Sequence, residues 1–143
     1  MILVDILLLY LAFRAKQVIC DFFLQTGWLA MAKEAVLSRE GMKALAIHAG
    51  IHAAFTFMLV VVFAPKLWWL GIVDFFIHAA IDRTKAALVL KNGWTYKHFQ
   101  YWWAFGVDQE AHNLTHVVYI VLIVMSWDWQ SLGMAAAAPM AGG

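Results

Sequence analysis

The chain has 143 residues, of which 64% are hydrophobic and 13% are charged, and its formal net charge is +1. Soluble domains are roughly one quarter charged, so this composition indicates a protein whose solvent is the lipid bilayer. The small net charge provides no basic surface for nucleic acid, and the single cysteine, Cys20, excludes an intramolecular disulfide, a cysteine-rich zinc site and an iron-sulfur cluster held by this chain alone.

The first predicted span covers about residues 4–29 and is apolar with polar interruptions. At about 100° per residue, Gln17, Asp21 and Gln25 share one helix face, which is typical of a bundle helix with a polar interior. Lys16 lies off that face, so we expect it to extend to a membrane interface, or the segment to be a short outer piece followed by a second helix. The chain start lacks the features of a signal peptide, so we expect this segment in the mature fold.

The second predicted span covers about residues 44–64 and ends before Pro65. It is apolar apart from His48, His52 and a threonine, and it is long enough to cross the hydrocarbon of a bilayer. The preceding residues, 31–43, are polar and amphipathic, and they predict a surface turn and helix that connect the first two spans.

The third predicted span covers about residues 67–90 and carries the clearest polar stripe. Ionisable groups are costly in hydrocarbon and are rarely placed there without a partner or a function. The stripe therefore predicts that this helix faces a polar interior. Four residues within an arc of about 80° form it: Asp74, His78, Asp82 and Lys85.

The fourth predicted span covers about residues 104–127 and carries Asp108, His112 and His116 at four-residue spacing. An aromatic cluster over residues 94–103 precedes it and is typical of the lipid headgroup level. Each of the four spans thus places polar residues at intervals of four, which keeps them on one face of a helix.

These segments predict an all-α, polytopic membrane protein, a bundle of four transmembrane helices with a polar interior. We expect one domain over residues 1–130 and a flexible tail over residues 131–143. Basic residues are more frequent in the first and third connections than in the second. The positive-inside rule therefore places those two connections in the cytoplasm and both termini outside.

The polar residues also reach compatible depths. Measured from the cytoplasmic ends at about 1.5 Å per residue, they share one layer between the inner interface and the midplane. Imidazole and carboxylate together suit zinc, iron or manganese, whereas calcium prefers oxygen ligands alone. We therefore predict a divalent-metal site, with His48, His52, His78, Asp82, Asp108 and His112 as the ligand candidates. We expect four further residues either to bind the ion directly or to hydrogen-bond to a ligand of the ion. They are Asp21, Asp74, Gln109 and His116.

Such a site would suit a metal-dependent hydrolase acting near the cytoplasmic interface on a lipid-borne or phosphate-containing substrate. The ion lowers the pKa of bound water, Asp21 or Asp74 takes the proton, and Lys85 stabilises the developing anion. The sequence shows no Gly-rich phosphate loop, no serine nucleophile motif and no Glu-x-x-His motif. Nucleotide-driven work, serine hydrolysis and di-iron oxidation are therefore disfavoured.

Two other interpretations stay open. Polar residues in membrane bundles also hydrogen-bond helix to helix without any ion, so the chain could be a non-catalytic subunit of a larger membrane complex. An oligomeric proton or metal transport component is the other alternative, because four spans without an inverted repeat do not build a monomeric transporter. The small residues Ala46, Gly50 and Ala54 form a ridge that is a candidate interface for a homo-oligomer or complex.

Four ordered segments carry a family resemblance over about residues 15–120. They are Asp21-Phe-Phe-Leu-Gln25-Thr, His48-Ala-Gly-Ile-His52, His78-Ala-Ala-Ile-Asp82-Arg-Thr-Lys85 and Asp108-Gln109-Glu-Ala-His112. In order and approximate spacing they resemble the bacterial and phage membrane family catalogued as domain of unknown function 3307. The resemblance implies a multi-pass protein of the bacterial inner membrane and no particular activity. Its pattern has a histidine where this chain has Gln17, so if that histidine is a ligand in relatives, this chain uses one fewer or an amide instead.

Overall fold

The computed structural model describes the backbone of residues 2–136 and the side chains of residues 3–127. The described residues form helices and no strand, which confirms the all-α prediction. Of the predicted tail, residues 131–136 continue the last helix and residues 137–143 lie outside the described part. The elements are α1 Ile2–Val18, the π-helical turn η1 Ile19–Phe23, α2 Gly27–Ala32, α3 Arg39–Phe63, the 3-10 turn η2 Pro65–Leu67, α4 Leu70–Asn92 and α5 Phe99–Ala136.

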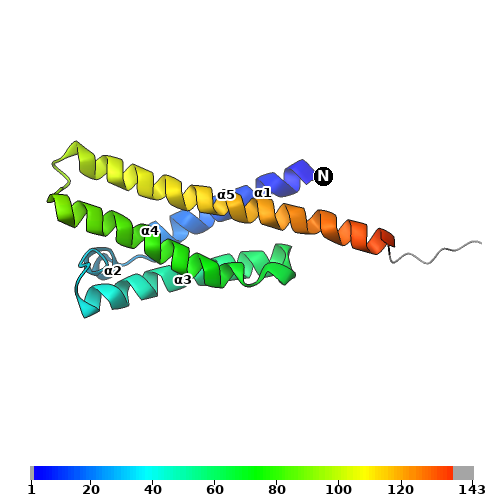
Figure 1. Ribbon diagram of the computed structural model, residues 1–143, viewed down its shortest axis with the longest axis horizontal. Helices are drawn as coiled ribbons and strands as arrows, with labels where there is room; N and C mark the ends of the chain where they lie inside the picture. The colour runs from blue at the N-terminus through cyan, green and yellow to red at the C-terminus, as the bar shows by residue number, and fades with distance from the viewer. Residues whose placement is uncertain (1, 137–143) are drawn as a thin grey trace, which may run out of the picture.

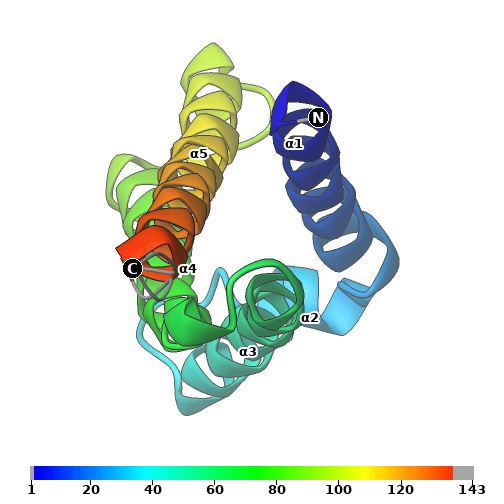
Figure 2. The ribbon, with the colours of Figure 1, turned by 90° about the vertical axis from the view of Figure 1, so that its right-hand side faces the viewer.

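The four long helices run antiparallel to their neighbours (Figure 1). Seen along the bundle they surround a common interior, with α1 against α3 and α5, and α4 against α3 and α5 (Figure 2). The connections over residues 24–38 and 93–98 lie at one end, and the connection between α3 and α4 lies at the other end (Figure 1). We call the first of these the connection end.

Local sequence signals set the helix boundaries. The Ser38 side chain accepts a hydrogen bond from the backbone N–H of Gly41 at 2.8 Å and so caps the start of α3. Pro65 follows the end of α3, where a helix cannot continue unbroken. Gly93, with φ of 63°, ends α4 in the left-handed conformation that glycine tolerates best.

The first predicted span is not one continuous helix. After η1 the chain breaks, and the Thr26 side chain accepts a hydrogen bond from the backbone N–H of Leu29 at 3.3 Å to start α2. The extension of Lys16 to an interface is wrong, because this side chain is only 2% exposed. It belongs to an interior face with Phe13 and Cys20, spaced by three and four residues, so the interior face of α1 is rotated from the predicted one.

The bundle interior has an apolar half and a polar half. The apolar half lies toward the end that holds the connection between α3 and α4. The polar half lies toward the connection end and holds the predicted stripes. The buried residues of the apolar half are Leu9, Phe13, Val60, Ala64, Leu70, Tyr119, Ile120 and Ile123.

Among the helices that the structure describes, α3 is the one long and apolar enough to cross a membrane by length and composition. Helix α1 has 17 residues before η1 begins, and α4 carries Asp74, Asp82, Arg83 and Lys85. Charges that face a bundle interior lower the hydropathy of a helix as much as charges that face lipid. Helix composition therefore supports one span and does not confirm the predicted bundle of four spans.

Close packing between α3 and α4 depends on a glycine. A Cβ atom added at Gly71 would lie 2.7 Å from the Cβ atom of Phe57. We expect Gly71→Ala to lower the free energy of unfolding by about 1–3 kcal/mol, because one helix must shift. The control is Gly50→Ala on α3, where an added Cβ atom meets nothing within 4 Å. That change should be neutral or stabilising by up to about 1 kcal/mol, and equal losses in thermal unfolding would contradict the prediction.

Candidate metal centre

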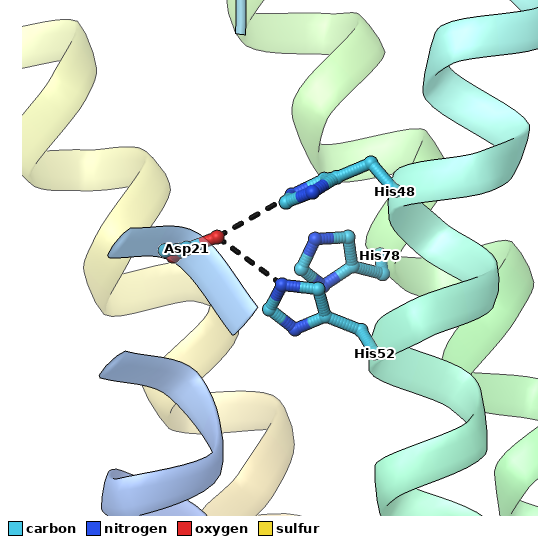
Figure 3. A group of neighbouring side chains, drawn as sticks. All are labelled: Asp21, His48, His52 and His78. Carbon is cyan, nitrogen blue, oxygen red and sulfur yellow. Dashed lines mark hydrogen bonds and ion pairs between the residues drawn. The ribbon is translucent and has the colours of Figure 1, made fainter. Parts of the chain in front are cut away.

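Asp21 of η1, His48 and His52 of α3, and His78 of α4 point toward one another (Figure 3). One donor atom from each lies within 4.8 Å of the others. The Oδ1 atom of Asp21 lies 3.3 Å from Nε2 of His48 and 3.1 Å from Nε2 of His52. We call these four residues the first donor group. Three histidines and one carboxylate supply the nitrogen and oxygen ligands that zinc and similar ions bind.

A second donor group lies next to the first and consists of His78, Asp82 and His112. The Oδ1 atom of Asp82 is 3.2 Å from Nε2 of His112, and its Oδ2 atom is 3.9 Å from Nε2 of His78. His112 belongs to α5, so the two groups join donors from η1, α3, α4 and α5. His78 is common to both groups and therefore lies at the middle of the cluster.

The imidazoles of this cluster are buried, and several of their nitrogen atoms have no hydrogen-bond partner among the described residues. His48 and His52 are 0% exposed and His78 is 1% exposed. Both ring nitrogens of His48 and His78 lack a hydrogen bond, as does Nδ1 of His52. Leaving a buried polar atom unpaired costs about 1–3 kcal/mol. A bound cation that accepts the nitrogen lone pairs would offset part of that cost.

A cavity of about 350 Å³ leads to the donors, and we call it the polar cavity. Its lining includes Asp21, Asp82 and Asp108. Asp108 stands beside the second donor group, with Oδ1 3.8 Å from Nε2 of His112 and without a hydrogen-bond partner in the described structure. It is thus a carboxylate at the edge of the cluster and not a member of either group.

Two lysines line the polar cavity as well. The Lys33 ammonium donates to Oδ2 of Asp82 at 2.8 Å, and the Lys85 ammonium donates to Oε1 of Glu34 at 2.5 Å. Lys85, predicted to stabilise an anion, therefore lies at the polar cavity. The contact of Lys33 was not expected, because residues 31–43 were predicted to form a surface connection. The three aspartates that line the polar cavity were the available signal for this contact, because buried carboxylates need a nearby cation to balance their charge.

Asp74 and His116 belong to a different set of side chains. The Oδ2 atom of Asp74 accepts hydrogen bonds from Lys16 at 3.1 Å and from Thr56 at 2.7 Å. The Lys16 ammonium also lies 3.1 Å from Nε2 of His116. We call these residues the Lys16 cluster. Asp74 is on the same helix face as His78 but one turn away. Its hydrogen-bond partners are Lys16 and Thr56, and neither belongs to a donor group.

Amide side chains hold Asp21 in place. The amide nitrogen of Gln17 donates to Oδ2 of Asp21 at 2.7 Å, and that of Gln109 donates to the same atom at 3.4 Å. Oδ1 of Asp21 remains directed toward the histidines. Gln17 therefore acts on the carboxylate that joins the first donor group, a supporting role that orients a ligand.

Comparison with known proteins places these residues inside one matched region. A family model described as "Protein of unknown function (DUF3307)" matches residues 6–139. No curated protein and no solved structure matches the chain. The matched region contains every residue of both donor groups, of the polar cavity and of the Lys16 cluster.

Proposed function

The chain belongs to the DUF3307 family, and on the geometry of its core we propose that it is a membrane protein with a divalent-metal centre in the bundle interior. The observation that carries this proposal is the convergence of four imidazoles and two carboxylates from four helical elements. Unpaired buried nitrogens in the same cluster support it. The mixture of donors fits zinc, iron or manganese.

The six donors divide into two sets of equal composition. One set is Asp21, His48 and His52, and the other is His78, Asp82 and His112. Each set provides two imidazoles and one carboxylate, and three protein ligands leave a position for water on the ion, as catalytic zinc sites do. Bundle cores and hydrolytic enzymes use pairs of ions in this way. The centre we propose therefore holds two ions.

The chemistry that this arrangement supports is hydrolysis. A bound divalent ion lowers the pKa of its water ligand. Asp108 lines the polar cavity, and its Oδ1 atom accepts no hydrogen bond from the described residues, so we propose that it would take the proton. Lys85 at the same cavity would stabilise the anion that forms. Asp108 takes this role in place of Asp74, because Asp74 is bound by Lys16 and Thr56.

The distribution of side chains supports four membrane spans, formed by α1 with η1, α3, α4 and α5. Large apolar side chains cover the exterior, among them Leu7 at 56%, Val62 at 75% and Phe76 at 66% exposed. Ionisable side chains such as His78 and Asp82 are buried instead, which is the arrangement expected in lipid. Basic residues are frequent at the connection end, so this end faces the cytoplasm of a bacterial inner membrane and both termini lie outside.

A role as a subunit is the second candidate, and the surface of α3 favours it. Ala46 and Ala54 are exposed, and the half-buried Gly50 between them has open space where a side chain would stand. Ridges of small residues let membrane helices approach closely. A second copy or a larger membrane complex could therefore pack on this face of α3.

Metal analysis of the purified chain tests the proposal. After purification in detergent from cells supplied with zinc, iron and manganese, we expect about two divalent ions per chain. Removal of the ions by a chelator should abolish hydrolysis of a lipid phosphate in mixed micelles, and returning them should restore it. A folded, stable chain that retains no metal under these conditions would overturn the proposed centre.

A further inference from the structure

A second cavity lies between α4 and α5 beside the polar cavity. Its volume is about 680 Å³, and we call it the α4–α5 groove. Its lining is mostly apolar and includes Leu88, Trp103 and Val107, which are 44%, 66% and 70% exposed. The groove and the polar cavity share two lining residues, Lys85 and Asp108. An apolar space open to the exterior thus lies next to the space that leads to the donor groups, with Lys85 and Asp108 at their common boundary.

We propose that the α4–α5 groove holds the hydrocarbon chain of a membrane amphiphile whose phosphate headgroup lies in the polar cavity. This inference rests on the proposed metal-dependent function, and it names the class of substrate for that site. Ligand sites are usually apolar spaces with a few well-placed polar groups, and the two adjacent cavities together have this character.

The direction of the groove suits a lipid chain. Its lining on α4 runs from Ala80 to Leu88, about 12 Å of helix, and on α5 from Gln100 to Ala111, about 16 Å. The groove therefore follows the seam between two helices that we propose cross the membrane. Trp94 and Trp103 line it too, and Trp94 lies in the connection that precedes α5. Tryptophan is common at the headgroup level, so the groove begins there and extends toward the midplane.

Lys85 connects the apolar space to the polar one. Its side chain is 12% exposed, and its ammonium donates to Glu34 and lies 5.7 Å from the centre of the Tyr101 ring. Glu34 and Tyr101 line the polar cavity and not the groove. The ammonium is therefore on the polar side, while the residue also lines the groove. This is the position that a cation needs to bind the headgroup of a molecule whose chain fills the groove.

The charge of the polar cavity agrees with a phosphate once metal is bound. Four carboxylates and two lysines line it, which gives a formal charge of −2 from −4 and +2. Two divalent ions would change this total to about +2. A phosphate monoester carries about −1.5 to −2 at neutral pH, so the loaded cavity complements that headgroup. The four carboxylates are Asp21, Glu34, Asp82 and Asp108, and the two lysines are Lys33 and Lys85.

Photolabelling of the full chain in lipid nanodiscs tests the inference. The phosphate probe is dodecylphosphonate with a diazirine near the end of the chain, because its carbon–phosphorus bond resists the proposed hydrolysis. The matched alcohol probe is the corresponding dodecanol. We expect saturable labelling of groove residues on α4 and α5 that excess unlabelled dodecylphosphonate removes. Labelling of the apolar exterior of α1, such as Leu7 and Leu8, should not saturate, because that surface only contacts bulk lipid.

Two variants separate the chain site from the headgroup site. Ala104→Phe fills the groove that Ala104 lines, and it should reduce groove labelling by both probes about tenfold. Its control is Ala15→Phe on the exposed surface of α1, which should change nothing. Lys85→Gln should weaken labelling by the phosphate probe about tenfold, equivalent to about 1.4 kcal/mol, and leave the alcohol probe unaffected. If Ala104→Phe does not fold, the positions of the saturably labelled residues in the parent chain test the inference by themselves.

The same samples are analysed for metal, so the two proposals can fail separately. Metal-loaded protein without saturable groove labelling would overturn the lipid inference and leave the metal centre in place. Saturable groove labelling of a metal-free chain would support the groove as a lipid site and overturn the metal centre. A crosslink from one chain to another across the groove, with the probe excluded, would show that a second copy fills it and would also overturn the inference.

Discussion

Replacing His78 and Asp82 together with alanine should remove the ion that we propose for the set of His78, Asp82 and His112. His78 is within reach of both donor groups, and Asp82 is the only carboxylate of the second group. Changes in residues that merely orient a ligand cost about 10–100-fold in metal affinity, so losing two ligands should cost more than about 100-fold. Elemental analysis after dialysis against a competing chelator measures this. We expect about two ions per chain in the parent and at most one in the variant, because Asp21, His48 and His52 remain.

The control removes the same two residue types outside the cluster. Asp5 and His98 are both exposed, so Asp5→Ala with His98→Ala should retain metal like the parent. Circular dichroism of both variants checks that the helices are intact. Equal metal content in the parent and the His78→Ala, Asp82→Ala variant would show that the bound metal lies elsewhere, and the donor groups would then be structural polar contacts.

Four-residue spacing predicted most of the donors because helix geometry is local. His48 and His52, for example, must lie on one face of α3 whatever surrounds them. Depth along each helix then predicted which residues of different spans meet, and the structure brings five of the six ligand candidates together in the two donor groups. The sixth, Asp108, lies beside them, and Asp21 lies within the first group.

Contacts that depend on helix rotation or on chain reversal were not predictable in this way. The rotation of α1 decides whether Lys16 faces lipid or the interior, and the polar pattern of α1 was centred on Gln17. Lys33 meets Asp82 only because the segment between η1 and α3 folds back over the bundle end. Long side chains also reach partners that spacing along one helix cannot reveal.

The angular pattern also grouped Asp74 with His78, although the two have different partners. Residues four apart share a face but differ by about 6 Å in height. In the structure that height separates the donor groups from the Lys16 cluster, where Asp74 has a lysine and a hydroxyl instead of a histidine. The polar residues on one helix face can thus belong to two different sites. The residues on the facing helices determine to which site each of them belongs.

The Lys16 cluster should respond strongly to the loss of its cation. In the structure Lys16 and Asp74 are each 2% exposed and form an ion pair of 3.1 Å. We expect Lys16→Met to lower the free energy of unfolding by about 3–5 kcal/mol, because it leaves the Asp74 carboxylate buried without its counter-charge. The loss is measured by denaturant or thermal unfolding in detergent, with metal content followed on the same samples.

A second variant distinguishes the ion pair from simple packing. Lys16→Met with Asp74→Asn removes both charges and keeps a carbonyl oxygen that can accept the hydrogen bond of Thr56. Replacing both partners of a buried pair is often neutral, whereas removing one is costly, so most of the stability should return in this double variant. If the double variant is instead as unstable as Lys16→Met alone, the loss comes from the lysine side chain itself. Metal retained by both variants would show that the Lys16 cluster stabilises the bundle independently of the donor groups.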